Sequence, residues 1–411
     1  MRKRLLLLII SITLGLCGCK LSTYLPRRAE IDRLEFIRII GIDKGSKDSE
    51  DIKITMLYLP HEEESKEQSQ GNSGGQAGQQ ANVSTMVSEG KTISEAIKKA
   101  QMESSREIFL GHVFGVIIGD EAAKEDLNKY MDFISRGIEF RLNNNMYIAK
   151  GMDAGELIMK SSQSEDFLSD IVEHFSKNYN ITSTSGNKKL IELMGELDDK
   201  NKGVVIPAIA LIEKKGEAPQ GEAKDKEGKA VLKLDGYGII KNGKLIDYAD
   251  EDVSTGINIL NNKYVSGNIT ITDPYGQEVN LEVIELLSEK TYRFSGDNIE
   301  SVTLKIIVNS NLDEQHSRED IYTKENLEYL FMEQAEVVKK DVYGAIEFAK
   351  DNNVDVLGFG RDIFRKHPIR WEKVEAQWDS IFPNLQVDLD VKSRVVRTYD
   401  ITQPNRMKGM E

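Results

Sequence analysis

The sequence predicts a multi-domain α+β protein of mixed α/β character, and three observations support this. The first half alternates short apolar runs with amphipathic helical patterns, residues 230–297 are rich in strand patterns, and residues 323–352 carry a helical apolar stripe. A chain of 411 residues is also too long for one compact core. We therefore expect an α/β N-terminal domain (31–212), a strand-rich middle domain (230–297) and a C-terminal domain (298–400) whose long helix packs on a sheet.

The beginning of the chain is typical of an export signal. Three basic residues precede a nearly all-apolar run from Leu5 to Leu16, which is shorter than the ~20 residues that span a bilayer as a helix. The run ends in Leu16-Cys17-Gly18-Cys19, which resembles the bacterial lipobox. We expect residues 1–18 to be a signal peptide, Cys19 to become an N-palmitoyl, S-diacylglycerol cysteine, and residues 19–30 to be a tether. The alternatives are an ordinary signal peptide and an uncleaved anchor.

Cysteine content and charge narrow the possible functions. Cys17 and Cys19 are the only cysteines, so cleavage and lipidation would leave no free thiol, disulfide or thiolate metal ligand. A formal net charge of −14 argues against binding to nucleic acid or to anionic headgroups through the net field. The expected membrane anchor is therefore lipid, and because one acyl chain binds only marginally, we expect a multiply acylated cysteine.

The N-terminal domain is expected to alternate strands with helices. The strands expected from apolar patterning are Ile31–Ile42 paired with Asp51–Leu59, then Val113–Ile118, Met146–Ala149 and Val204–Ile212. The expected helices are one that begins at the capping box Thr92-x-x-Glu95, one over Ala122–Ile134, and a polar one over Ser161–Leu197. The Gln-, Gly- and Ser-rich run 61–84 cannot bury enough apolar area to become ordered, and we predict a disordered loop there.

The second half begins after a hydrophilic stretch, Glu213–Lys229, that is either a hairpin tip or a linker. Leu232–Tyr292 is strand-rich, and Val302–Val308 and Leu385–Val396 are further expected strands. The clearest helix lies within residues 323–352. Its apolar stripe consists of Leu327, Phe331, Ala335, Val338, Val342, Ile346 and Ala349.

Several fragments imitate catalytic motifs but lack the required context. Gly71–Gly75 fits G-x-S-x-G inside the low-complexity run, where no strand-turn-helix supports a nucleophile. Gly90-Lys91-Thr92 resembles the end of a phosphate loop, but Thr85 stands where its first glycine belongs. The five histidines are too scattered for a local metal site, and we interpret His112 as structural. We expect no catalytic residues, metal site or cofactor, and thus a protein that is not an enzyme.

Four stretches of the chain carry the motifs of one known family. They are Ala29–Asp32 with Gly41-Ile42-Asp43-Lys44; Gly90–Ala96 with Gly111-His112, the VFGVIIG strand, Asp132–Arg136 and Ala149-Lys150-Gly151; Tyr237–Ile240 with Asn242–Leu245; and Asp355–Gly360 with Arg365–Pro368, Trp371, Trp378, Ile381 and Phe382. Together they resemble the Ger(x)C family, the lipoprotein C subunits of nutrient germinant receptors in endospore-forming bacteria. The resemblance covers nearly the whole mature chain outside the two low-complexity tracts.

The fourth stretch is the most specific, with the pattern D-x-L-G-F-G…W…W…F. It contains both tryptophans of the chain, Trp371 and Trp378, whose spacing places them on one face of a helix. We interpret Gly358, Gly360, Trp371 and Trp378 as signature residues with a structural role. One departure concerns the tether: family members usually follow the lipidated cysteine almost at once with a Trp-Asp or Trp-Asn pair, which KLSTYLPRRA lacks. The membrane-proximal geometry is therefore left open.

The resemblance implies a non-enzymatic scaffold or signalling subunit of a spore germinant receptor. It would be anchored by lipid on the outer face of the inner spore membrane. Its partners would be an integral-membrane A subunit and a B subunit similar to amino-acid transporters, which is the stronger candidate for the nutrient pocket. The germinant, the docking surface and the stoichiometry are left open.

The main alternative is a solute-binding lipoprotein that captures a small nutrient directly. Proteins of that class usually have two similar α/β lobes, whereas the strand-rich second half of this chain differs from the first. A deep cleft lined by aromatic residues would favour capture, whereas an exposed apolar patch on a convex body would favour a scaffold. A surface hydrolase is disfavoured by the failed motifs.

Overall fold

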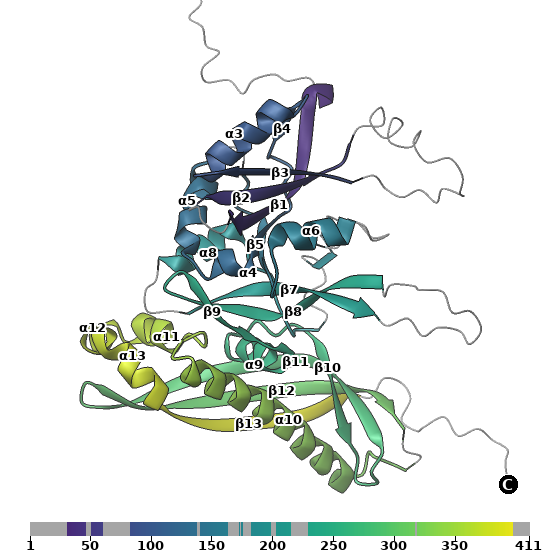
Figure 1. Ribbon diagram of the computed structural model, residues 1–411. Helices are drawn as coiled ribbons and strands as arrows, with labels where there is room; N and C mark the ends of the chain where they lie inside the picture. The colour runs from purple at the N-terminus through teal and green to yellow at the C-terminus, as the bar shows by residue number, and fades with distance from the viewer. Residues whose placement is uncertain are drawn as a thin grey trace, which may run out of the picture.

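The computed structural model describes residues 31–46, 51–60, 83–137, 140–162, 172, 174–175, 182–198, 203–214, 229–316 and 319–397. This part of the chain forms two sheets, of nine and four strands. In Figure 1 the nine-stranded sheet occupies the upper part of the view and the four-stranded sheet the lower part, with α9 between them. The predicted signal peptide, Cys19 and the tether lie outside the described residues, as does the predicted loop except for its last two positions.

The nine-stranded sheet is parallel at its centre and antiparallel on both sides. Its strands are β1 (Leu34–Lys44), β2 (Ile52–Tyr58), β3 (Ser84–Gly90), β4 (Glu107–Phe109), β5 (Gly115–Gly119), β6 (Asn145–Ala149), β7 (Val204–Lys214), β8 (Lys229–Lys241) and β9 (Lys244–Ala249). The order is β3-β2-β1-β5-β6-β7-β8-β9, with β4 beside β1. Strands β1, β5, β6 and β7 run parallel, and β5 is buried along its whole length, because helices cover both faces of the sheet.

Alternate residues of the central strands supply two different cores. Ile40, Val116 and Ile118 point to the face covered by α3 (Ile93–Glu103), α4 (Asp120–Ala123), α5 (Leu127–Arg136) and α8 (Leu190–Leu197). Ile39 and Ile117 point to the opposite face, which is covered by α6 (Ala154–Ser162). This alternation is what a strand with a side-chain period of two produces between two helical layers.

The four-stranded sheet carries its helices on one face. Its order is β10 (Gly267–Thr272), β11 (Glu278–Ser295), β12 (Asn298–Gln315) and β13 (Gln386–Arg397). The long helix α10 (Lys324–Asp351) crosses this sheet and packs against α9 (Glu251–Leu260) and β13 (Figure 1). Strand β13 runs parallel to β12, so the chain needs a long crossover between them. That crossover consists of α10, α11 (Phe359–Lys366), α12 (Pro368–Val374), η3 (Glu375–Gln377), α13 (Trp378–Ile381) and η4 (Phe382–Asn384).

The two sheets share one hydrophobic core at their junction. Tyr237, Ile239 and Ala249 of β8 and β9 pack with residues of α9, α10 and the four-stranded sheet. Helix α9 directly follows β9, and its Gly256 lies so close to α10 that a Cβ would collide with the carbonyl oxygen of Asp341. The junction is therefore a packed interface, with no linker between the sheets.

The predicted fold class is confirmed, but the sheets divide the chain differently from the expected domains. Residues 230–249, expected in the middle domain, form β8 and β9 of the first sheet. The expected boundary at 297/298 falls in the turn between β11 and β12. These two strands form one hairpin, in which Val279 pairs with Gln315 at one end and Ser295 pairs with Asn298 at the other. The reason is that strand pairing continues across both expected boundaries: β11 pairs with β12, and β7 and β8 pair as far as Lys214 and Lys229, the arrangement of a hairpin.

Individual elements follow the predictions with five corrections. The expected helix over 122–134 is split into α4 and α5, because Asp126 caps α5 through a bond from the Asn128 N–H at 3.0 Å. The expected helix over 161–197 is not continuous, since residues 182–188 are non-helical. Ser84, expected in the loop, begins β3, which was not predicted, and α9 was also missed. Trp371 and Trp378 lie on two short helices separated by η3, so they do not share one helix.

Candidate functional site

Three motif segments, from the first two family-like stretches, meet at the carboxyl edge of the parallel strands. Asp43 lies near the end of β1, Gly119 ends β5 and Lys150 follows β6, and these three strands are neighbours. This edge is where α/β sheets usually bind ligands. It is therefore the first place where a functional site is expected.

Asp43 caps a helix that lies 111 residues further along the chain. Its side chain is 1% exposed and accepts hydrogen bonds from the N–H groups of Ala154 at 2.7 Å and Gly155 at 2.8 Å, at the start of α6. Burial raises the pKa of Asp43 to about 6, and the two backbone donors oppose that rise. Gly119 is required beside it, since a Cβ there would collide with the Asp43 carboxylate. This aspartate is thus a clamp between sheet and helix.

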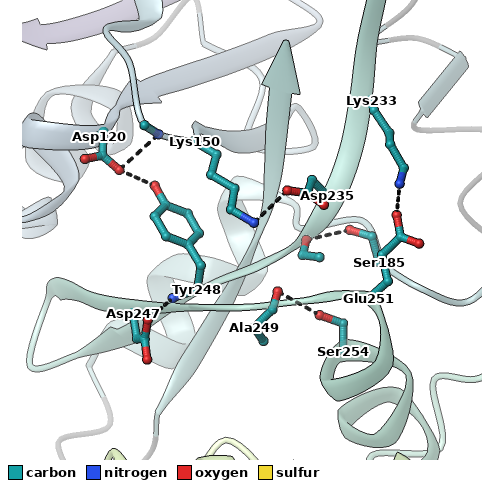
Figure 2. Close-up of polar contacts among 12 residues, drawn as sticks. Asp120, Lys150, Ser185, Lys233, Asp235, Asp247, Tyr248, Ala249, Glu251 and Ser254 are labelled. Atoms are coloured by element: carbon teal, nitrogen blue, oxygen red, sulfur yellow. Dashed lines mark hydrogen bonds and ion pairs between the residues drawn. The ribbon is translucent and has the colours of Figure 1, made fainter. Parts of the chain in front are cut away.

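A second polar network joins this edge to β8 and β9 (Figure 2). Tyr248 points its hydroxyl at Asp120 and donates to it at 2.5 Å, while the Gly151 N–H donates to the same oxygen at 3.3 Å. Lys150 extends to Asp235 at 2.6 Å (Figure 2). Burial would raise the pKa of Asp120, but hydrogen bonds from Lys124 and Tyr248 outweigh it and lower that pKa.

These contacts engage each of the polar side chains named above at this edge. Burial and the Asp120 carboxylate raise the pKa of Tyr248, so its hydroxyl remains a protonated donor. Asp43 is bonded to backbone N–H groups, and Lys150 is held in an ion pair by Asp235. The edge therefore fastens strands and helices together, and its geometry suits a structural role.

The signature loop of the C-terminal half is built in a similar way. Asp355 is buried and accepts hydrogen bonds from the N–H groups of Phe359 at 3.0 Å and Gly360 at 2.6 Å, at the start of α11. Burial raises the pKa of Asp355. Gly358 has a φ of 72°, a conformation that favours glycine. The D-x-L-G-F-G sequence is thus a helix cap that its own residues complete.

The two tryptophans close over the same loop. Their rings meet edge to face with centroids 5.2 Å apart, and Trp378 also contacts Phe382. A Cβ on Gly360 would lie 2.7 Å from the Trp371 ring and 3.0 Å from the Trp378 ring, so glycine allows both rings to approach. All four predicted signature residues therefore lie in one cluster.

This cluster also touches the first sheet. The N–H of Gly203, just before β7, donates to the carbonyl oxygen of Asp355 at 3.3 Å. The ammonium of Lys241, at the end of β8, donates to the carbonyl oxygen of Asn353 at 2.6 Å and contacts Asp379 at 3.1 Å. The signature loop is therefore part of the junction between the sheets.

A cleft of about 370 Å³ opens next to the signature loop, between the two halves of the molecule. Residues near β7 and α8 line one side, and α9, β11 and α11 line the other. Its described lining contains no aromatic side chain. The described lining residues are Lys188, Glu196, Gly203, Val205, Ile257, Asn258, Leu260, Asn261, Asn262, Lys263, Ser288, Glu289, Lys290, Val356, Gly358, Arg361, Asp362, Arg365 and Lys366.

The remaining motif fragments fall into structural positions or outside the described residues. Gly71–Gly75, His61 and Cys19 lie outside them. Thr92 caps α3, accepting from the Glu95 N–H at 3.1 Å, so Gly90-Lys91-Thr92 belongs to a helix cap. His112 is exposed in the turn before β5, edge-on to Phe36 with centroids 5.1 Å apart. Within the described chain, no three His, Cys, Asp or Glu side chains are grouped to hold a metal ion.

The sequence did not reveal the capping role of Asp43, the hydrogen bond of Tyr248 to Asp120, or the cleft. Asp43 belongs to the Gly41-Ile42-Asp43-Lys44 motif, but the helix that it caps is too distant in sequence to be inferred. Tyr248 belongs to no recognisable motif.

No helix in the described ranges combines the length and apolar character needed to cross a bilayer.

Comparisons with known proteins agree with these motifs. The family described as "Spore germination protein N-terminal domain" matches residues 27–211, and the family "Spore germination B3/ GerAC like, C-terminal" matches residues 235–399. Spore germination protein KC of Bacillus subtilis (strain 168) is 25% identical over 327 residues, covering 77% of this chain and 79% of that protein. Spore germination protein B3 of the same organism is 22% identical over 398 residues, covering 93% and 94%. The crystal structure of the GerBC protein matches with a TM-score of 0.50 and 17% identity, covering 89% of this chain and all of that one.

Proposed function

The chain belongs to the Ger(x)C family of spore germination proteins, and on that basis we propose that it is the lipoprotein subunit of a nutrient germinant receptor. The observation that carries the proposal is that two germination-protein families match successive regions, which together span most of the chain. The proposed subunit is a non-enzymatic scaffold or signalling component. It acts beside membrane-embedded A and B subunits, and the transporter-like B subunit holds the nutrient.

The geometry of the motif residues supports a role without catalysis. Asp43, Asp120 and Asp355 each bond to backbone N–H groups, and Tyr248 and Lys150 are engaged with carboxylates. Family-like residues of this chain thus stabilise helix starts and the junction between sheets. A rigid two-sheet body of this kind can present surfaces to partner subunits.

Lipid at Cys19 would supply the membrane attachment. Tethering raises the local concentration of the body at the membrane, so that even a weak interface with the A or B subunit can be occupied. The outer face of the inner spore membrane is the proposed location, since an exported lipoprotein is anchored on the far side of the membrane it crosses.

Direct nutrient capture is the less favoured alternative. The nine-stranded and four-stranded sheets are unlike, whereas solute-binding proteins usually have two similar lobes. The cleft between them has a polar and charged described lining without aromatic side chains. By contrast, Leu287 and Ile307 pair on adjacent strands and are 50% and 45% exposed, the kind of apolar surface that a scaffold presents to a partner.

Deletion of the gene in the native spore-former tests the proposal. We expect the deletion strain to lose its response to at least one nutrient, and Cys19→Ala to reproduce that loss while the chain is still made. Cys17→Ala is the matched control, since signal cleavage removes Cys17 and its loss is expected to be neutral. Normal germination of the deletion strain with every nutrient, in a background without paralogues, would show the receptor assignment to be wrong.

A further inference from the structure

The cleft between the two sheets is rich in cations although the chain is acidic. Six of its described lining residues are basic and three are acidic, whereas the whole chain has 54 Lys and Arg against 68 Asp and Glu. The basic residues are Lys188, Lys263, Lys290, Arg361, Arg365 and Lys366, and the acidic ones are Glu196, Glu289 and Asp362. This local reversal of charge sign is the feature that requires an explanation.

Three of the six cations hold the walls of the cleft. Lys188, with a side chain only 1% exposed, pairs with Glu196 at 2.6 Å. The ammonium of Lys290 donates to the carbonyl oxygen of Leu357 at 2.6 Å, and Lys366 pairs with Asp362 at 2.9 Å. Lys188 places a fixed, buried positive charge on the side of the cleft formed by the first sheet. Lys290 holds the signature loop, and Lys366 forms an ion pair within α11.

The other three cations are uncompensated. Lys263, Arg361 and Arg365 form no ion pair with any acidic side chain in the described ranges. Arg361 and Arg365 are four residues apart on α11, so they lie on the same face of that helix. Like charges held close together repel each other, and an anion between them removes that cost.

The cations are carried on a rigid frame. Asn261 donates to the carbonyl oxygens of Ile257 and Val356, both at 3.0 Å. Asn262 exchanges two hydrogen bonds with the backbone of Ser288, at 2.9 and 2.8 Å. These bonds fix the backbone that leads into Lys263 to both β11 and the signature loop. The cleft is therefore preorganised, which lowers the entropic cost of binding.

Helix stability alone does not account for the cluster. Arg365 and Lys366 lie in the last turn of α11, where cations favour the helix dipole. That explanation does not apply to Arg361, which lies in the first turn of α11, where the helix dipole disfavours a cation. Arginine guanidinium groups match the planar oxygens of carboxylate and phosphate and bind them with paired hydrogen bonds.

We propose that this cleft binds a small oxyanion that carries two or more negative charges on phosphate or carboxylate groups. Its volume of about 370 Å³ lies within the range of small-molecule sites. The anion contacts Arg361 and Arg365 on one side and the region of Lys188 on the other. Because these residues come from both halves of the molecule, the bound anion stabilises the packing of the two sheets. The site is independent of the lipid tether and of the germination role.

Calorimetric titration of the full chain with pyrophosphate and with citrate, at constant ionic strength, tests this site. We expect saturable binding of at least one probe at a single site, together with slower hydrogen exchange at residues 203–205 and 356–361. The double substitution Arg361→Gln/Arg365→Gln is expected to weaken binding by about tenfold or more. Both side chains are exposed, so the variant retains its fold.

A matched control separates the cleft from net charge. Arg136→Gln/Arg394→Gln removes the same charge from exposed positions on α5 and β13, outside the described lining of the cleft. We expect the control to bind within about twofold of the unmodified chain, since long-range charge effects are screened. Equal weakening in both variants, or no saturable binding by either probe, would overturn the proposal.

Vesicles containing phosphatidylglycerol form a third arm, because a lipid headgroup also carries phosphate. Binding to the vesicles that needs both arginines, without binding of pyrophosphate or citrate, would replace the soluble anion by a membrane surface and overturn the proposal. These titrations use the purified chain, so their outcome is separate from that of the germination experiments.

Discussion

Two buried aspartates perform the same local task in the two halves of the molecule. Asp43 accepts two backbone N–H bonds at the start of α6, and Asp355 accepts two at the start of α11. Burial raises the pKa of both carboxyl groups. The difference is distance along the chain: Asp43 acts across 111 residues, while Asp355 acts across four and five.

That difference separates two kinds of motif. The Asp355 loop forms its cap from consecutive residues and is therefore visible as a short signature. The Asp43 cap exists only after β1 and α6 have come together, so it is a tertiary contact. The first defines the shape of a loop, whereas the second fastens a helix to a sheet.

Trp378→Ala tests whether the local motif depends on its aromatic cover. Trp378 is 3% exposed and packs on Trp371, Phe382 and Gly360. Its truncation should lower the free energy of unfolding by about 3–5 kcal/mol, as is typical for a buried tryptophan. Urea denaturation followed by far-UV circular dichroism measures the change. Phe364→Ala, at a position 55% exposed on α11, is the control and should cost far less; an equal cost would mean that the aromatic cover is unimportant.

Asp43→Ala and Asp355→Ala compare the two caps directly. Each leaves two buried N–H groups unpaired and should lower the free energy of unfolding by about 2–4 kcal/mol. The two variants should differ in tryptophan fluorescence, because both tryptophans lie beside the Asp355 loop and no tryptophan lies in the first sheet. Native tryptophan emission should shift in Asp355→Ala only, and faster hydrogen exchange of α6 should appear in Asp43→Ala only. A shift of emission in both variants would contradict the separation.

The pH dependence of stability isolates Asp43. Because the pKa of Asp43 is about 6 in the folded chain and 3.8 for an ordinary aspartate, the folded chain binds more protons between these values. Stability contributed by this group is present below pH 4 and is lost as pH rises through 6. From pH 4.5 to pH 7 the loss should be about 2 kcal/mol.

Asp43→Asn, which cannot ionise, gives the test. Its cost relative to the unmodified chain should be smaller at pH 7 than at pH 4.5, as measured by urea denaturation at both values. Asp341, whose pKa burial also raises to about 6, is present in both proteins, so its effect cancels. A cost that does not vary with pH would show that Asp43 does not titrate in this range.

Lys241→Gln has the smallest expected effect and tests the link between the two regions. It removes the bond to the Asn353 carbonyl oxygen, while the contact with Asp379, which is 75% exposed, contributes little. The expected loss is about 1 kcal/mol. Lys244→Gln, an exposed substitution across the same turn, is the control and should be nearly neutral. An equal loss of free energy of unfolding in the two variants would show that Lys241 does not stabilise the junction.

Patterns that depend on neighbouring residues were predicted well. The capping box at Thr92 is confirmed, and the apolar stripe of 323–352 predicted α10 to within one residue at each end. Strands with continuous or alternating apolar residues also lie where expected, including β5 and β13. In these segments local chemistry and tertiary packing favour the same structure.

The failures occur where distant contacts decide the structure. Helix α9 contains Ser254, Thr255 and Gly256, which have weak helix propensity, and it is stabilised by close packing of Gly256 on α10. The Asp43 clamp and the basic cleft likewise combine segments that are far apart in the sequence. The signature residues were recognisable from the sequence, but the contacts that explain them, such as Gly360 against two indole rings, were not.

The parallel pairing of β13 with β12 has a consequence for the order of assembly. Strand β13 can pair with β12 only when α10 and the two tryptophan-bearing helices have packed, because those segments form the connection. Until the last described strand is added, β12 has an unpaired edge along most of its 18 residues. A chain truncated before Gln386 should therefore expose the unpaired backbone N–H and C=O groups of β12. Chain termination or stalling near that point would favour aggregation over folding.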